Sequence, residues 1–274
     1  MEIIQYDFFR NALIACFLGG ISCSLIGVFV ITMEMPFLGV AMSHAAFAGA
    51  VFGLLGGVNP IAAAFVFCLL ASFIIGPLSE ASSFRADTSI GVIFSIMLGA
   101  GFLGLSLIQG PKTQALSLIW GSILTISGEA LYFMAAACAV VILIVAMFFK
   151  EIKAVIFHRG LAAASGIPEK VIFYIILVLS GAVVTANLTT IGGLLIFSLI
   201  INPAAAAFQL TFDMKKMFLL SSLFGVASCL AGLILSTWLN IPSGAVIILV
   251  SSGVFLLCLW LSPKRRADIA GRVF

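Results

Sequence analysis

The sequence predicts an all-α protein, a polytopic bundle of about nine transmembrane helices, with eight as the alternative. Of the 274 residues, 63% are hydrophobic and 8% are charged, and the mean hydropathy is +1.32. Soluble domains are about half apolar and about a quarter charged. Apolar runs of about 20 residues, the length a helix needs to cross a hydrocarbon core, recur along the whole chain. We therefore expect one transmembrane domain over residues 1–274.

Nine apolar runs are long enough to span, and proline marks the start of several of them. The expected spans cover residues 8–32, 36–57, 60–79, 88–108, 129–149, 169–187, 190–210, 215–238 and 243–262. Proline favours the first turn of a helix and pushes the preceding residue out of helical space, which suits Pro36, Pro60, Pro168 and Pro242. Glu2 and Asp7 stand where a signal peptide would be basic, so we expect the first run to be a retained helix.

The basic residues predict the orientation, because short cytoplasmic loops are enriched in Lys and Arg. With the N-terminus outside and the C-terminus cytoplasmic, only Arg10 and Lys112 of the 13 Lys and Arg lie outside. The inner ones are Arg85, Lys150, Lys153, Arg159, Lys170, Lys215, Lys216, Lys264, Arg265, Arg266 and Arg272.

The segment 109–128 fits none of the spans. Its apolar part, Ala115 to Ser127, is too short to cross and follows a polar stretch. We expect an interfacial or re-entrant helix on the outer side, with Trp120 at the membrane surface.

The sequence lacks the motifs of several function classes. It contains no GxxxxGK[ST], GxSxG or HExxH motif, so any ATP hydrolysis must belong to another subunit and the chain itself is not expected to be an enzyme. A net charge of +3 gives no reason to expect nucleic acid. The six cysteines lie in apolar runs without CxxC pairing, so we assign them no chemistry.

His44 is the strongest candidate for a functional residue. It is the only histidine within a span and lies about eight residues, or about 12 Å, inside the second one. Polar side chains at that depth usually face a protein interior or an aqueous pathway, and neutral imidazole binds transition metals. The alternative is that His44 only hydrogen-bonds a backbone carbonyl or a hydroxyl such as that of Ser43.

Two other polar positions have a functional and a structural interpretation. Asn202 precedes Pro203 near the middle of the seventh span, where its amide lines the pathway or satisfies a carbonyl freed by the proline. Asp87 opens the fourth span, and we expect it to cap that helix.

The longest inner loop, 150–168, contains the sequence FHRGLAAASGI. Leu161 to Ser165 predicts about one turn of small-residue helix, closed by Gly166. Such a helix beyond the membrane suits docking into a partner protein, and an ordinary connecting turn is the alternative.

Five segments, in this order, resemble the permease family of zinc, manganese and iron ABC importers. They are GVFVITMEMPFLGVAMSHAAFAG (27–49), DTSIGVIFS (87–95), FHRGLAAASGI (157–167), IGGLLIFSLIINPAAAA (191–207) and NIPSGAVIILV (240–250). The resemblance covers nearly the whole chain.

The resemblance implies a multi-pass permease in the cytoplasmic membrane of a bacterium or archaeon. Its partners would be a second copy of itself, two cytoplasmic ABC ATPase subunits that bind ATP, and an extracytoplasmic metal-binding protein. The chain would bind no cofactor of its own, and a divalent metal ion would be the cargo. The segment around His158, Arg159, Leu161, Ala162, Ala163 and Gly166 would couple the permease to the ATPase.

The resemblance also implies that the metal passes His44, and here the sequence departs from the family. Family members usually carry aspartate one turn before this histidine, whereas this chain has Val40. Aspartate and histidine at i and i+4 share a helix face and could hold a divalent ion together. With Val40, groups such as Ser43 or Asn202 must complete the pathway site, or the cargo differs. His158, Arg159 and Gly160 also replace a more common acidic, proline-containing start.

Three other functions are alternatives to a metal importer. An ABC permease for another small cargo would use the same architecture. A gradient-driven secondary transporter would use His44 as a proton relay and would need no ATPase. An intramembrane enzyme would need a nucleophile and base that face each other, which the neighbours Ser43 and His44 do not.

Overall fold

The computed structural model describes residues 7–81, 86–109, 111–120, 126 and 128–264. Within these ranges all regular structure is helical. The helices are α1 (Asp7–Thr32), α2 (Leu38–Leu55), α3 (Pro60–Ala81), α4 (Ala86–Leu107), α5 (Thr113–Trp120), α6 (Gly128–Met147), α7 (Phe149–Phe157), α8 (Arg159–Ala164), α9 (Glu169–Leu188), α10 (Gly193–Leu210), α11 (Met214–Leu239) and α12 (Ser243–Leu261).

Nine of the described helices, all except α5, α7 and α8, are long and apolar enough to cross a membrane. This confirms the predicted fold class, and each helix begins and ends within a few residues of its expected span. The prolines act as expected: α3 begins at Pro60, while Pro168 and Pro242 directly precede α9 and α12. The Asn59 side chain adds a cap to α3, because its Oδ1 accepts hydrogen bonds from the N–H groups of Ile61 and Ala62.

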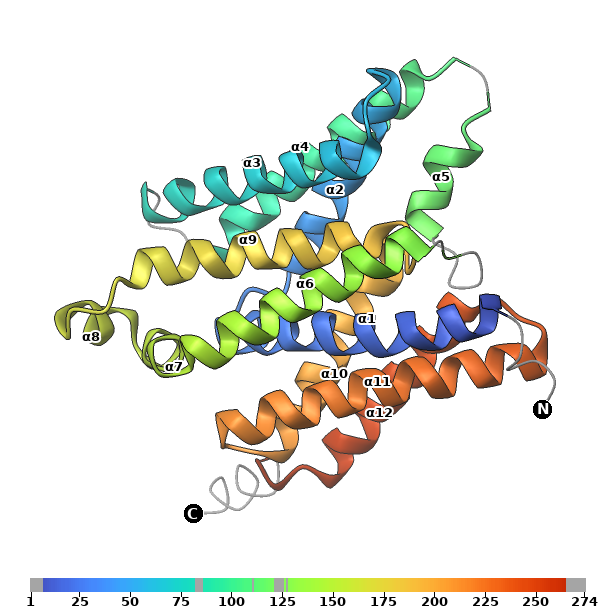
Figure 1. Cartoon of the computed structure of the whole chain (residues 1–274). Coiled ribbons are helices and arrows are strands. Elements are labelled where there is room, and N and C mark those ends of the chain that lie inside the picture. Colours follow the sequence, from blue (N-terminus) through green and yellow to red (C-terminus); the bar gives the residue numbers. More distant parts are fainter. Residues whose placement is uncertain (1–6, 82–85, 110, 121–125, 127, 265–274) are drawn as a thin grey trace.

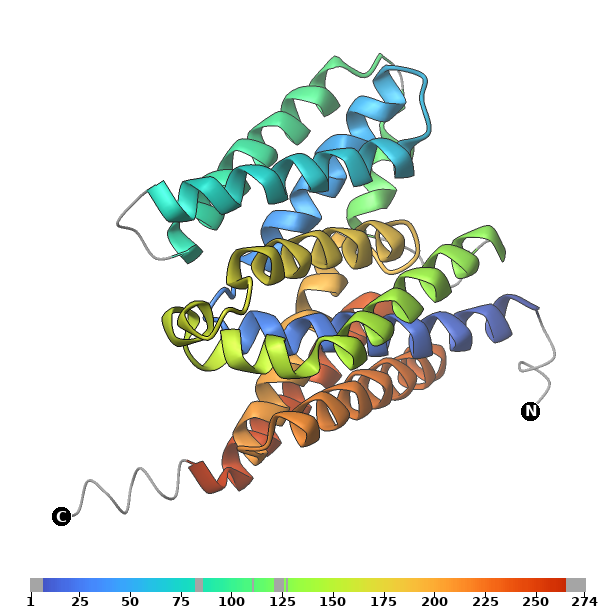
Figure 2. The same cartoon turned by 60° about the vertical axis from the view of Figure 1, so that its left-hand side comes forward.

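The helices form two groups joined through α9 and α10 (Figures 1 and 2). In the first group, α2 packs against α3 and α4. In the second, α1 packs against α6, α10 and α11, and α12 packs against α10 and α11. Helices α7 and α8 lie at one end of the bundle, here called the α8 end, and α5 lies toward the other, the α5 end (Figure 1).

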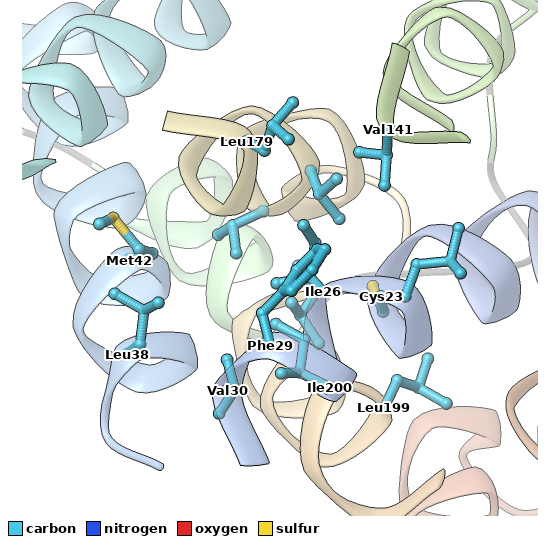
Figure 3. Close-up of a cluster of buried hydrophobic side chains, with 14 of the residues drawn as sticks. Cys23, Ile26, Phe29, Val30, Leu38, Met42, Val141, Leu179, Leu199 and Ile200 are labelled. Carbon is cyan, nitrogen blue, oxygen red and sulfur yellow. The ribbon is translucent and has the colours of Figure 1, made fainter. Parts of the chain in front are cut away.

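The centre of the bundle is built around α1, whose most apolar stretch is largely buried. Ile26 and Phe29 of α1 lie among side chains from α2, α6, α9 and α10 (Figure 3). The aromatic ring of Phe29 also contacts that of Phe218 on α11, edge to face, with 5.4 Å between centroids.

Glycines bring α1 close to its neighbours. A Cβ on Gly27 would overlap the carbonyl oxygen of Ile200 on α10. A Cβ on Gly225 of α11 would overlap the carbonyl oxygen of Gly20 on α1. Lipid provides no hydrophobic drive between helices, so such close backbone approach is how they gain contact energy.

Candidate functional site

A small, partly open cavity lies between α2, α5, α10 and the end of α9. Its volume is about 60 Å³, which leaves room for a few water molecules because one buried water needs about 10–15 Å³. Val40, Ser43 and His44 line it from α2. The structure therefore brings together three of the four residues that the sequence placed on the pathway.

His44 is half-buried, and its environment leaves one ring nitrogen without a partner. Its Nδ1 atom is buried, and it neither donates nor accepts a hydrogen bond within the described residues. The Ser43 hydroxyl donates to the Gly39 carbonyl instead, at 2.8 Å. The imidazole ring contacts Phe94 of α4 edge to face, with 5.1 Å between centroids. A buried imidazole nitrogen with no partner has a lone pair or a proton available for a ligand.

Val40 lies one helical turn before His44 and lines the same cavity. Both side chains are half-buried, while nearly all their neighbours on α2 are buried. A valine contributes no ligand atom, and in the described ranges no group of three or more His, Cys, Asp and Glu side chains is arranged so that it could hold a metal ion. This chain therefore offers a metal ion one imidazole from α2 and no carboxylate beside it.

Apolar side chains close the cavity around His44. Leu118 of α5, Leu188 of α9 and Phe197 of α10 complete its walls. A constriction lined by such groups holds back hydrated ions because it offers them no replacement ligands. Helix α5 takes part in this closure by packing against α2 and α10.

Asn202 lies elsewhere, between α10 and α12. Its side-chain amide group donates toward the hydroxyls of Ser198, Ser251 and Ser252 at 2.9 to 3.0 Å. Asn202 does not line the His44 cavity, and its hydrogens point to serines rather than to a carbonyl freed by Pro203. The serines that fix this amide were not recognised in the sequence, although Ser198 stands four residues before Asn202.

The segment after α6 contains more helix than the sequence indicated. Residues 150–157, expected to belong to a loop, lie in α7 (Phe149–Phe157), which buries Ile152 and Val155 against the bundle. A sharp turn at His158 then starts α8. The amphipathic spacing of Ile152 and Val155 is the signal that could have revealed α7.

Helix α8 is capped at both ends. The Nδ1 atom of His158 accepts a hydrogen bond from the Leu161 N–H at 3.2 Å, so this histidine is an N-cap. At the other end Gly166 has a φ of +80°. The Gly166 and Ile167 N–H groups donate to the carbonyls of Ala163 and Ala162, the pattern of a Schellman motif.

Arg159 links α8 to α9 through an ion pair and a ring contact. Its Nε donates to Oε2 of Glu169 at 2.7 Å, and its guanidinium lies 4.7 Å from the centre of the Phe173 ring. Ala162 is buried against this support, whereas Leu161 is 66% exposed. The segment thus presents a firmly held, mostly small-residue surface at the α8 end.

Asp87 lies in the first turn of α4, as expected, and also makes a contact that the sequence did not predict. Its Oδ1 accepts a hydrogen bond from the Phe37 N–H at 3.2 Å. Phe37 is the residue directly before α2, so Asp87 caps α2 from the first turn of α4. The start of the helix that carries His44 is thereby tied to α4.

Comparison with known proteins relates this architecture to membrane transport. A sequence profile of the ABC 3 transport family matches residues 5–262. The manganese transport system membrane protein MntC of Halalkalibacterium halodurans is 31% identical, over 96% of this chain and 90% of that protein. A Haemophilus influenzae protein named for an iron transport system is 28% identical, over 97% of each chain. The solved structure of PsaBC from Streptococcus pneumoniae in complex with Fab matches with a TM-score of 0.86 and 30% identity, over 97% of this chain and 95% of that one.

Proposed function

The chain belongs to the ABC 3 transport family and is the permease subunit of an ABC metal importer, and from this premise we propose that a divalent metal ion crosses past His44. The observation that carries the proposal is the unpartnered Nδ1 of His44 beside the small cavity. The metal is cargo, so a site that holds it weakly suits release better than a tight cage.

Manganese is the cargo we propose first, because the MntC relative is named for manganese transport. Iron is the second candidate, after the relative named for iron. Mn²⁺ favours oxygen ligands, and Val40 supplies none. We propose that the ion passes His44 with much of its water shell retained, since the cavity wall offers one imidazole and the Ser43 hydroxyl.

The proposed orientation places the α8 end in the cytoplasm. The described basic residues at that end support it: they are Lys150, Lys153, Arg159, Lys170, Lys215, Lys216 and Lys264. Arg85, Arg265, Arg266, Arg272 and the side chain of Trp120 lie outside the described residues. The N-terminus would then be outside and the C-terminus inside, in the cytoplasmic membrane of a bacterium.

The proposed assembly contains two copies of this chain, two cytoplasmic ATPase subunits that bind ATP, and an extracytoplasmic metal-binding protein. The exposed surface of α8 is the proposed contact for the ATPase, supported by the caps of this helix and the Arg159–Glu169 ion pair. Helix α5, the helical part of the segment 109–128 among the described residues, would be a re-entrant outer helix, which its packing against α2 and α10 supports.

We propose alternating access as the mechanism. The binding protein would deliver the ion at the α5 end, where movement of α5 removes Leu118 from the cavity. ATP-driven closure of the ATPases would move α8 and, through Arg159 and Glu169, α9. Because Leu188 at the end of α9 also lines the cavity, that motion would change access to His44.

Uptake by reconstituted vesicles tests this function. The permease, its ATPase and its binding protein are incorporated together, and entry of Mn²⁺, Fe²⁺ and Zn²⁺ is measured with and without ATP. We expect ATP-dependent uptake, strongest for Mn²⁺. Uptake driven by an ion gradient without the ATPase would instead identify a secondary transporter, and ATP-dependent uptake of none of the three metals would overturn the metal assignment.

A further inference from the structure

A cleft opens at the α8 end between α6 and α11. Both helices pack against α1, which lies between them in Figure 1. The cleft has a volume of about 670 Å³. Its floor is Leu25 of α1, and its walls include Val145 and Ala146 of α6 and Phe218 of α11. This lateral cleft is therefore apolar along most of its length.

The mouth of the lateral cleft is basic. Lys150 of α7 and Lys215 of α11 both line it, and both are exposed. The Lys215 ammonium lies 5.8 Å from the centre of the Phe149 ring, at the boundary between the apolar and the polar part. Glu151 also lines the cleft and is half-buried, so the two lysines outnumber the carboxylate.

The positive charge continues into a second hollow of about 490 Å³ that shares Phe149 and Lys215 with the cleft. It adds Lys153, whose ammonium lies 5.7 Å from the Phe157 ring. Asp213 is the carboxylate there, and its Oδ1 accepts hydrogen bonds from the backbone N–H groups of Lys215 and Lys216. That carboxylate is already engaged as the N-cap of α11.

We propose that the lateral cleft binds an anionic phospholipid, with an acyl chain along Leu25 and Val145 and the phosphate group between Lys150 and Lys215. The ligand must be apolar over its length and negative at one end, and basic pockets between transmembrane helices suit such lipids. The proposal depends on the chain lying in a bilayer and not on which metal it carries.

Charge argues against a second copy of the chain in this cleft, and position argues against an ATPase subunit. A second copy related by a two-fold axis along the membrane normal would place its own α8 end at the same level, so lysines would face lysines. An ATPase subunit beyond the membrane end would not reach Leu25 and Ile142, which lie within α1 and α6. In a bilayer, by contrast, lipid would surround this apolar surface of α6 and α11.

Native mass spectrometry of the purified permease tests the charged part of the site. The protein is offered an equal mixture of phosphatidylglycerol and phosphatidylcholine with the same acyl chains, and we expect it to retain the anionic lipid preferentially. Lys215→Gln should reduce that preference about fivefold, since one lysine near a membrane surface contributes about 1 kcal/mol. Lys216→Gln is the matched control, because Lys216 is exposed on the same helix but does not line the cleft.

Filling the cleft tests the apolar part. Ala146→Trp places a large side chain in the cleft and should abolish retention of the anionic lipid, whereas Ala139→Trp, exposed on the same helix outside the cleft, should not. Equal retention of the two lipids, an equal effect of the two lysine variants, or normal lipid retention by Ala146→Trp would each overturn the proposal. Loss of dimers with lipid retained in Ala146→Trp would assign the cleft to a second copy. Transport is not measured, so a wrong cargo assignment would leave these results unchanged.

Discussion

Val40 and His44 share one face of α2, yet only His44 can bind a metal. His44→Ala removes the imidazole, and we expect ATP-dependent uptake to fall at least about tenfold, a loss equivalent to about 1.4 kcal/mol at the pathway. Ser43→Ala is the control, because that hydroxyl donates to the Gly39 carbonyl and its loss should have a smaller effect. Unchanged uptake by His44→Ala, with normal binding of the ATPase, would assign His44 a structural role.

Val40→Asp would place a carboxylate one turn before His44. We expect the purified variant to bind Mn²⁺ about tenfold more tightly, or by about 1.4 kcal/mol, because a carboxylate oxygen and an imidazole then meet on one face. Transport should slow, since a tighter site releases its ion less readily. Val40→Asn has nearly the same shape without the charge, so equal metal affinity in both variants would contradict the explanation.

The sequence placed Val40 and His44 on one face of α2 because they stand four residues apart, and Val40 was singled out by the resemblance to metal importers; both residues, with Ser43, line the cavity. It could not place Asn202, because depth in the membrane says nothing about the direction in which a side chain points. The serines of α12 that hold Asn202 are separated from it by about fifty residues of chain. Leu118 and Leu188, which close the cavity, carry no polar signal at all.

At the scale of the helix, the crossing of α1 and α10 depends on Gly27. Gly27→Ala adds a Cβ that overlaps the Ile200 carbonyl oxygen and lies 2.9 Å from the Cβ of Ala204. We expect a loss of stability of about 1–3 kcal/mol, the usual result of overpacking. Gly99→Ala on α4 is the control, because its Cβ would meet nothing within 4 Å. The melting temperatures of the wild type, Gly27→Ala and Gly99→Ala are measured in the same detergent. A melting temperature for Gly27→Ala equal to that of the wild type would show that α1 and α10 can separate at no cost.

The long helices were predictable because hydrophobic length and proline act locally along the chain. Pro60, for example, both ends the preceding turn and begins α3. Helix α7 was missed because Lys150, Glu151 and Lys153 make the segment look like a loop when only membrane spans are sought. The turn at His158 could not be predicted either, because histidine is an uncommon N-cap residue. The Asp87 contact with Phe37 joins residues fifty positions apart and depends on the packing of α4 against α2.

At the scale of the whole molecule, α8 is where the proposed ATPase would act. Leu161 is exposed and its loss should not disturb the permease itself. We expect Leu161→Asp to abolish metal uptake while the isolated permease keeps its melting temperature, because a carboxylate replaces the apolar side chain at the proposed contact. ATPase activity and co-purification of the two subunits are measured alongside uptake. Normal coupled uptake by Leu161→Asp would remove α8 from the contact.

Three serine hydroxyls surround an Asn202 amide that has only two hydrogens to give. One acceptor is therefore always in excess, and Ser251 and Ser252 sit side by side on α12. Ser198 belongs to α10, whereas Ser251 and Ser252 belong to α12, so the amide joins the two helices through hydroxyls of both. The contact between α10 and α12 therefore keeps the donors of Asn202 paired inside a bilayer, where an unpaired polar group would be costly.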